Sequence, residues 1–317
     1  MKEPGGRRGH LRQVAWQRVS HGLYVSSGAD ALHAWQLVLP PSAAFTHLTA
    51  AAAYGLWLPP LPGDLPVFAR QSNDDPRPRR AGLRITRHTQ PVKVREQHGL
   101  RLVAPGEALL GCARDLALLD LVVLVDSALQ LAVCTNPELA AAAAERRVGA
   151  PRLRRALALC DERSESAWET LLRLLHVVCD IEVEPQYDVF EDGLFVARGD
   201  LWLTGTRVLH EYDGSEHLPR PRQRKDLRRS RRIVHTEWIR RGYTSTDVTG
   251  RAVTILRDAE LSLGRPHQPE RIRAWHRLLV ESLFTPTGTA AFRERVGLGP
   301  SRTGHELQPN PENSCSS

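Results

Sequence analysis

The pattern of apolar and polar positions in residues 1–158 is mostly that of helices. One short stretch, Trp16–Val25, is strand-like, and a Pro-rich loop is predicted at Leu58–Pro66. Runs of strong helix formers predict three helices: Thr46–Leu56, Ala108–Ala132 and Pro137–Leu159. We therefore expect residues 1–158 to form a mostly helical domain with a few strands.

Residues 159–262 have a different pattern, in which strands dominate. Apolar residues at helical spacing predict a helix over Ser166–Val178. Three runs predict strands: Pro185–Phe190, Leu194–Leu203 and Arg207–Asp213. A basic helix over Arg222–Thr236 and a short strand over Trp238–Thr244 complete this second region. The fold class expected for the whole chain is α/β (α+β).

The last region, residues 263–317, contains one predicted helix, Pro269–Leu283. The sequence after it is rich in Pro, Gly, Ser and Asn, with too few apolar residues to form a core. We therefore expect a helical extension followed by a disordered tail.

Composition excludes several classes of protein. The chain has 317 residues, of which 41% are hydrophobic, which is enough for real cores and favours more than one domain. No apolar run approaches the ~18 residues that a membrane span needs, and the N-terminus lacks the apolar core of a signal peptide. The five cysteines have no C-x-x-C spacing, so neither a disulfide framework nor a zinc site is expected. We expect a cytoplasmic protein.

Positive charge is concentrated in one segment. Residues 220–241 contain ten basic and two acidic residues, whereas the whole chain has a net charge of +7. Like charges at helical i, i+4 spacing repel one another unless an anionic partner is present. This segment therefore predicts contacts with DNA phosphates, through five residues in particular: Arg224, Lys225, Arg228, Arg229 and Arg232.

Two acidic residues are predicted to meet on a β-hairpin. If Thr204-Gly205 forms a two-residue turn, Asp200 pairs with Leu209, on the face that also carries Glu211 and Asp213. Asp200 and Glu211 are then diagonal neighbours, with Cβ atoms roughly 7 Å apart. Such a pair of carboxylates can share Mg²⁺ or Mn²⁺. The alternative is a pair of solvated carboxylates on an edge hairpin.

The residues after this hairpin favour the metal site. Asp213-Gly214 suits a turn with positive φ, which would return His217 toward the end of the strand. Carboxylates beside an imidazole can combine metal binding with proton transfer. Asp213 is an additional candidate ligand.

Glu169 has two competing interpretations. Ser166 and Glu169 have the spacing of a capping box, in which the Glu accepts the N–H of the N-cap residue. The same first helical turn could also face a metal site, and the two roles are compatible.

Several short motifs of residues 164–250 resemble the very-short-patch repair endonuclease-like family. They are Ser166-Ala-Trp-Glu169-Thr170, Gly199-Asp200-Leu201, Glu211-Tyr-Asp213-Gly214 with His217, Asp226-x-x-Arg229 and Trp238-Ile-Arg-Arg241. The resemblance implies the PD-(D/E)XK, restriction-endonuclease-like fold, a mixed sheet flanked by helices. Most members of the superfamily have a lysine two positions after the second acid, and this position is Asp213 here. Very-short-patch-like members also lack that lysine.

This resemblance implies roles for four residues. Asp200 is the principal metal ligand, Glu211 the second acidic position and Glu169 the acid of the first helix. His217 corresponds to the histidine that follows the Asp-Gly turn. The implied chemistry is hydrolysis of a phosphodiester with Mg²⁺ or Mn²⁺, in which His217 or a carboxylate accepts the proton.

The N-terminal region resembles abortive-infection antitoxin regulators of the AbiEi type. The motifs are Trp16-x-Arg18-Val-x-x-Gly22-x-Tyr24-Val25, His47-x-x-Ala50-Ala51 and Gly55-Leu56. In that family a winged helix-turn-helix precedes the first motif, but here only 15 residues precede Trp16. We therefore expect either that this chain lacks the recognition helix or that the start of the gene has been placed too far downstream.

The sequence thus predicts a DNA endonuclease, a nicking enzyme of repair or of defence against foreign DNA. The alternative is a DNA-binding regulator of the antitoxin type, in which the nuclease-like domain is only a scaffold. DNA is the expected partner in both cases. A toxin or defence-system protein and a second copy of the chain are further candidates.

Overall fold

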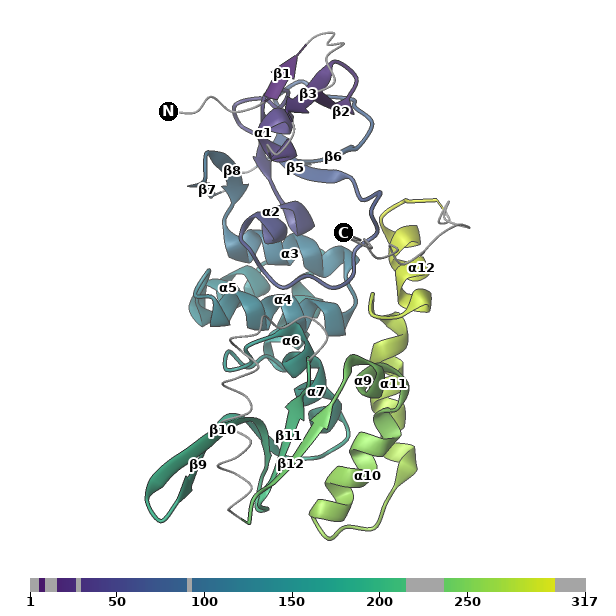
Figure 1. The fold of residues 1–317 in the computed structure, drawn as a ribbon. Helices are drawn as coiled ribbons and strands as arrows, with labels where there is room; N and C mark the ends of the chain where they lie inside the picture. Colours follow the sequence, from purple (N-terminus) through teal and green to yellow (C-terminus); the bar gives the residue numbers. More distant parts are fainter. Residues whose placement is uncertain (1–5, 9–15, 27–29, 90–92, 215–236, 300–317) are drawn as a thin grey trace, which may run out of the picture.

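The structure is a computed structural model that describes residues 6–8, 16–26, 30–89, 93–214 and 237–299. It is a mixed α/β protein with three sheets. Figure 1 shows an elongated molecule, with two sheets at the N-terminal end, a layer of helices in the middle and the third sheet at the other end. No helix among the described residues is long and apolar enough to cross a membrane.

The first sheet is small and has the order β1-β3-β2. Its strands are β1 (Gly6–Arg8), β2 (Trp16–Ser20) and β3 (Leu23–Ser26). The predicted strand Trp16–Val25 is thus a hairpin, because Gly22, at φ +65°, turns the chain in its middle. The helix α1 (Ala31–Gln36) follows and is capped by the Asp30 side chain.

The second sheet shows that the prediction of a mostly helical N-terminal domain is wrong. It has the order β6-β5-β4-β8-β7. Its strands are β4 (Ala44–Phe45), β5 (Val67–Ser72), β6 (Leu83–His88), β7 (Val94–Gln97) and β8 (Leu100–Val103). β4 pairs in parallel with β8, and β5 with β6. β7 and β8 form a local antiparallel hairpin with a turn at His98 and Gly99, which the sequence analysis missed. The other strands are short and pair in parallel or with partners more than ten residues away, so the local sequence carries little sign of their pairing.

Two of the three predicted N-terminal helices are each divided into two. The helices of this layer are α2 (His47–Ala53), α3 (Pro105–Asp115), α4 (Leu118–Gln130), α5 (Asn136–Ala144) and α6 (Ala150–Leu157). Leu116 is extended, at ψ 149°, and breaks the first run. Gly149 has φ +97° and breaks the second, after the capping box of Thr135 and Glu138 has started it.

Helix α4 lies at the centre of the molecule, and its two aspartates bind elements from elsewhere in the chain. Asp126 accepts hydrogen bonds from the Thr170 hydroxyl and the Arg173 guanidinium, both at 2.8 Å. Asp120 accepts hydrogen bonds from the Ser282 hydroxyl and from the Leu283 N–H. Both carboxylates are fully buried. These contacts attach the second and third regions of the chain to the first.

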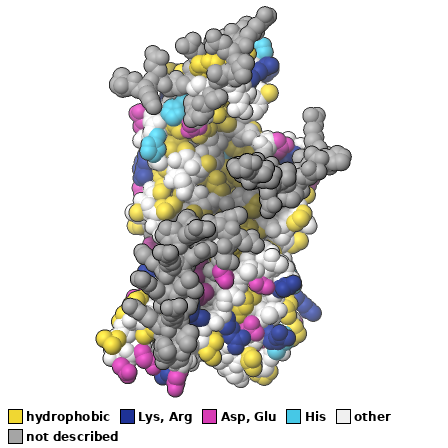
Figure 2. Space-filling view, viewed as in Figure 1, with side chains coloured by type: hydrophobic (Ala, Val, Ile, Leu, Met, Phe, Trp, Pro, Cys, Tyr) yellow, Lys and Arg dark blue, Asp and Glu magenta, His cyan; other side chains and the backbone are white. Residues whose placement is uncertain are grey.

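The third sheet has the order β12-β11-β10-β9 and is close to prediction. Its strands are β9 (Val183–Glu191), β10 (Leu194–Leu203), β11 (Val208–Tyr212) and β12 (Ile239–Tyr243). β9, β10 and β11 are antiparallel, and β12 runs parallel to β11. Helix α7 (Ala167–Val178) packs against this sheet through apolar residues and through His176, which hydrogen-bonds to His210 of β11. Figure 2 shows acidic side chains at the tip of the β9–β10 hairpin, where Asp188 and Asp192 are exposed.

The C-terminal helices run back along one side of the molecule (Figure 1). They are α9 (Ser245–Gly250), α10 (Ala252–Ser262), η2 (Pro269–Arg271), α11 (Ile272–Glu281) and α12 (Pro286–Arg295). Arg293 forms a bidentate ion pair with Asp64, and the Arg84 guanidinium donates a hydrogen bond to the carbonyl of Val296. The predicted helix Pro269–Leu283 is confirmed as η2 and α11. The prediction of only one helix in residues 263–317 is wrong, because α12 follows and buries Phe292. The remainder of the predicted tail, from residue 300 onward, lies outside the described residues.

Candidate functional site

Helix α7 begins at a polar cap that positions Glu169. Ser166 is the N-cap, and its hydroxyl accepts the N–H of Glu169 at 3.2 Å. The Glu169 carboxylate accepts the N–H of Glu165 at 2.8 Å and the Ser166 hydroxyl at 2.9 Å. The predicted N-cap is therefore confirmed, but the carboxylate returns to the N–H of residue 165 and not to that of the N-cap residue.

The same carboxylate also faces the sheet. Gln186 of β9 donates its amide N–H to Oε2 of Glu169 at 2.9 Å. Gln186 itself has φ +53°, a left-handed conformation that is uncommon for a residue with a Cβ. Glu169 thus contacts the cap of α7, although not as a true capping box, and makes a second contact where α7 meets the sheet. Its role at a metal site stays a prediction.

The register of the β10–β11 hairpin differs from the predicted one by two residues. Trp202 pairs with Leu209 and Leu201 with His210, so continuing this register brings Asp200 level with Glu211 and not with Leu209. The turn is longer than two residues, because the Thr206 hydroxyl accepts the Val208 N–H at 3.0 Å. A shift by an even number leaves the face of each side chain unchanged. Asp200 and Glu211 are consequently closer along the strands than expected.

The side-chain alternation of β10 is interrupted beside Asp200. Ala197 and Trp202 are five residues apart, yet both pack in the small cluster around Leu209. A Cβ on Gly199 would lie 2.8 Å from the Leu209 side chain. The carboxylate of Asp200 accepts the N–H of Tyr212 from β11 at 2.9 Å. Asp200 therefore lies between two strands at an irregular point of the sheet.

Glu169 and Asp200 influence each other electrostatically. Burial, and after it the negative charge of Asp200, raises the pKa of Glu169 to about 7. Burial lowers the pKa of Arg240, and Asp200 opposes that change. The two acids, from α7 and β10, thus share one partly buried region with Arg240 of β12.

Glu211 is held by an ion pair. Arg240 Nε donates to Glu211 Oε1 at 2.7 Å, and a second guanidinium nitrogen of Arg240 donates to Oε2. The Glu211 side chain is only 13% exposed. A bidentate pair of this kind is among the stronger side-chain contacts. The second predicted ligand is therefore engaged with Arg240, which the sequence analysis placed in the basic segment and in the Trp238-Ile-Arg-Arg241 motif but did not expect to bind Glu211.

Of the remaining predicted site residues, the structure describes only Asp213. Asp213 follows β11, is exposed, and donates its N–H to the Tyr243 carbonyl at 2.8 Å. His217 lies outside the described residues. So do the five residues predicted to bind DNA: Arg224, Lys225, Arg228, Arg229 and Arg232. Among the described residues, no group of three or more His, Cys, Asp or Glu side chains could hold a metal ion.

A buried polar chain, which sequence reasoning missed, supports the site from the other side of β11. His176 Nε2 and His210 Nδ1 share a hydrogen bond at 2.9 Å, and Tyr243 donates its hydroxyl to Asp258 at 3.2 Å. Burial lowers the pKa of His176 to about 4 and that of His210 to about 2, so both imidazoles are neutral. Because the partners lie on α7, β11, β12 and α10, no local sequence pattern could identify them.

Comparisons with family models, with curated proteins and with solved structures find no match for this chain. The assignment of a function therefore depends on the geometry of the site and on the motifs of the sequence.

Proposed function

We propose that residues 159–262 form a divalent-metal-dependent endonuclease that cleaves DNA phosphodiester bonds. The observation that carries the proposal is the placement of Glu169 beside Asp200, two partly buried acids from different elements whose negative charges repel each other. Mutual repulsion of buried carboxylates costs free energy unless a cation binds between or near them. The mixed order of the sheet, with α7 packed against it, supports a restriction-endonuclease-like fold.

The donor chemistry fits a hard cation through Asp200. Carboxylate oxygens are the ligands that Mg²⁺ prefers, and Mg²⁺ keeps several waters rather than requiring a full protein cage. Glu169 is the neighbouring carboxylate, and Glu211 could join only after releasing Arg240. When bound, such a cation would polarise the phosphate and lower the pKa of a water. The chain's own contribution is to position these carboxylates and to hold the DNA.

The proposal is tested by incubating the full chain with supercoiled plasmid in Mg²⁺, in Mn²⁺ and in EDTA. Nicking in the presence of either metal is expected, with a loss of at least about 100-fold in Asp200→Asn. Asp188→Asn is the matched control, because Asp188 is an exposed acid of the same sheet. Unaltered cleavage by Asp200→Asn would exclude this site as the catalytic one.

A non-catalytic regulator of the antitoxin type is the second candidate, and the Arg240–Glu211 ion pair favours it. That pair neutralises one of the predicted ligands without a metal. Binding of the same plasmid without nicking in any metal, for intact, mismatched and single-stranded DNA, would support this candidate over the nuclease.

The basic segment is common to both candidates and has its own test. Neutralising Arg228, Arg229 and Arg232 together is expected to weaken DNA binding and to reduce the slope of affinity against salt by about 3. Fluorescence anisotropy at several salt concentrations measures this. An unchanged slope would show that phosphates are bound elsewhere.

A further inference from the structure

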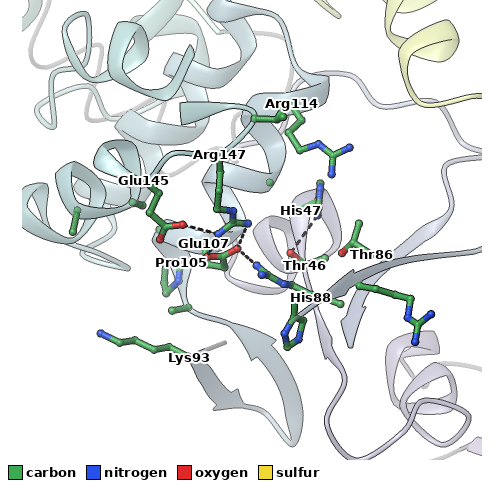
Figure 3. Close-up of a pocket in the computed structure, with 18 of the residues that line it drawn as sticks. Thr46, His47, Thr86, His88, Lys93, Pro105, Glu107, Arg114, Glu145 and Arg147 are labelled. Carbon is green, nitrogen blue, oxygen red and sulfur yellow. Dashed lines mark hydrogen bonds and ion pairs between the residues drawn. The ribbon is translucent and has the colours of Figure 1, made fainter. Parts of the chain in front are cut away.

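A large cavity lies in the N-terminal region, far in sequence from the acids of the third sheet. Its volume is about 940 Å³, and it is lined by the start of α2, by β5 and β6, by α3 and by the segment from α5 to residue 148. Figure 3 shows side chains from these elements converging on it. A space of this size can hold a small organic molecule. None of the residues assigned to the proposed nuclease lines it.

The lining carries a surplus of positive charge. Glu107 is bound by both Arg70 and Arg147, and Arg147 also binds Glu145 at 2.8 Å (Figure 3). By contrast, the side chains of Lys93 and Arg114 form no hydrogen bond or ion pair with any other residue that the structure describes. Because Arg70 and Arg147 are already paired with carboxylates, Lys93 and Arg114 can attract an anion.

The base of the cavity contains a histidine in an unusual conformation. His47, the first residue of α2, has φ +51° and is only 6% exposed. Its ring stacks on Phe68, and its Nδ1 shares a hydrogen bond with the Thr46 hydroxyl at 3.2 Å. Nε2 of this ring has no hydrogen-bond partner among the described residues. Strained backbone conformations of this kind are concentrated at ligand sites.

Two further features keep this imidazole in place and neutral. A Cβ on Gly111 of α3 would lie 2.8 Å from Nδ1, so only glycine leaves room for the ring. Burial, followed by the charges of Arg114, Arg84 and Arg70, lowers the pKa of His47 to about 3. A neutral imidazole with one nitrogen in use offers one further hydrogen bond to a ligand.

We propose that this cavity binds a phosphate monoester, with Arg114 contacting the phosphate, His47 hydrogen-bonding to it and Lys93 adding to the positive charge of the lining. A guanidinium matches two phosphate oxygens at once, and a concave site strengthens the attraction by excluding part of the solvent. The phosphate can belong to a free nucleotide or to the 5′ end of a DNA strand, and the cavity volume accommodates the attached nucleoside in either case.

Isothermal titration of the full chain tests the proposal with five probes. They are inorganic phosphate, AMP, adenosine, and a short single-stranded oligonucleotide with either a 5′-phosphate or a 5′-hydroxyl end. Tighter binding of AMP than of the phosphorylated oligonucleotide assigns the site to a free nucleotide, and the reverse order assigns it to a DNA end. Binding of neither phosphate-bearing probe, or equal binding of adenosine and AMP, overturns the proposal.

Two matched variants locate the binding. Arg114→Gln is expected to weaken the affinity for the better probe about tenfold, because Arg114 is exposed and has no partner in the described structure to lose. Arg146→Gln removes the same charge from an exposed residue that does not line the cavity, and its affinity should stay within about twofold of the original. Equal effects of the two variants would mean that general attraction, not this cavity, binds the phosphate.

A third variant tests the histidine. Gly111→Ala should displace the His47 ring and weaken binding, whereas Gly63→Ala, where a Cβ meets open space, should not. A thermal melt of each variant shows that it is folded. Because the cavity shares no residue with Asp200 or Glu169, failure of this proposal leaves the proposed nuclease untouched, and failure of the nuclease leaves this proposal standing.

Discussion

Asp126 of α4, which is fully buried, and Glu169 of α7, which is half-buried, both accept several hydrogen bonds, but their electrostatic surroundings are opposite. Asp126 binds Arg173 at 2.8 Å, together with the Thr170 hydroxyl and the Asp161 N–H. Glu169 binds the Glu165 N–H, the Ser166 hydroxyl and the Gln186 amide, which are all neutral. Burial raises the pKa of each acid. Arg173 opposes that rise at Asp126, and Asp200 adds to it at Glu169.

The difference separates a carboxylate that stabilises the fold from one that is suited to a ligand. Asp126 has its countercharge on the neighbouring helix, so nothing further is needed to balance it. Glu169 and Asp200 repel each other, and this repulsion is relieved by a proton or by a cation. Buried acids of the second kind are typical of binding and catalytic sites.

The largest expected effect in this comparison is that of Asp126→Asn. The asparagine amide would point an N–H at the N–H of Asp161 and would leave the guanidinium of Arg173 buried without its countercharge. We expect a loss of about 3 kcal/mol in the free energy of unfolding. Urea denaturation measures this, with Asp188→Asn as the exposed control. A loss below about 1 kcal/mol would show that the pair is replaceable.

Asp120, the other aspartate of α4, is an intermediate case with a pH-dependent effect. Its donors are neutral, and burial raises its pKa to about 6. A raised pKa in the folded state means that the stabilisation is fully present below about pH 4 and is lost as the pH rises through about 6. From pH 5 to pH 8 this group should lower the free energy of unfolding by about 1 kcal/mol.

Asp120→Asn is expected to remove that decrease. Urea denaturation of both proteins at pH 5 and pH 8 measures it, since only the difference between the proteins reports this group. Parallel curves for the variant and the original protein would assign the pH dependence to other residues.

The smallest expected effect, of opposite sign, is that of Glu169→Gln. The amide oxygen can keep the Glu165 and Gln186 donors, which both bind Oε2, and the amide N–H can donate to the Ser166 hydroxyl. Removing the repulsion with Asp200 should then raise the free energy of unfolding by about 1 kcal/mol at pH 8 in EDTA. A destabilised Glu169→Gln would contradict the contrast with Asp126, because it would mean that the charge itself supports the fold.

Local patterns predicted the elements around the candidate site well. The Ser166 cap, α7 and the strands β9 to β12 lie where the periodicity of the sequence placed them. Helix periodicity and N-caps depend on residues three or four positions apart, so they are readable from the chain. The breaks at Leu116 and before Ala150 were missed, because the apolar and alanine-rich runs continue across them.

The strand register around Asp200 could not be predicted from the sequence, for a different reason. The face of Asp200 does not follow from strand periodicity alone, because the alternation of β10 is interrupted beside it, and its partner depends on whether the turn uses two residues or four. The Thr206 hydroxyl bond to Val208 decides this, and a Thr-Gly turn is compatible with either arrangement. The second sheet was missed for a related reason, since its parallel pairs join strands that are distant in the chain.

The sequence by itself determined which acids the chain has, which elements carry them and where positive charge is concentrated. Only the tertiary structure decided which acid receives a countercharge. Arg240 reaches Glu211 because β12 pairs in parallel with β11, while Asp200 comes to lie near Glu169 because α7 packs on the sheet. Whether a carboxylate lies beside positive or negative charge depends on residues from distant parts of the chain. Those residues take their positions only when the core assembles.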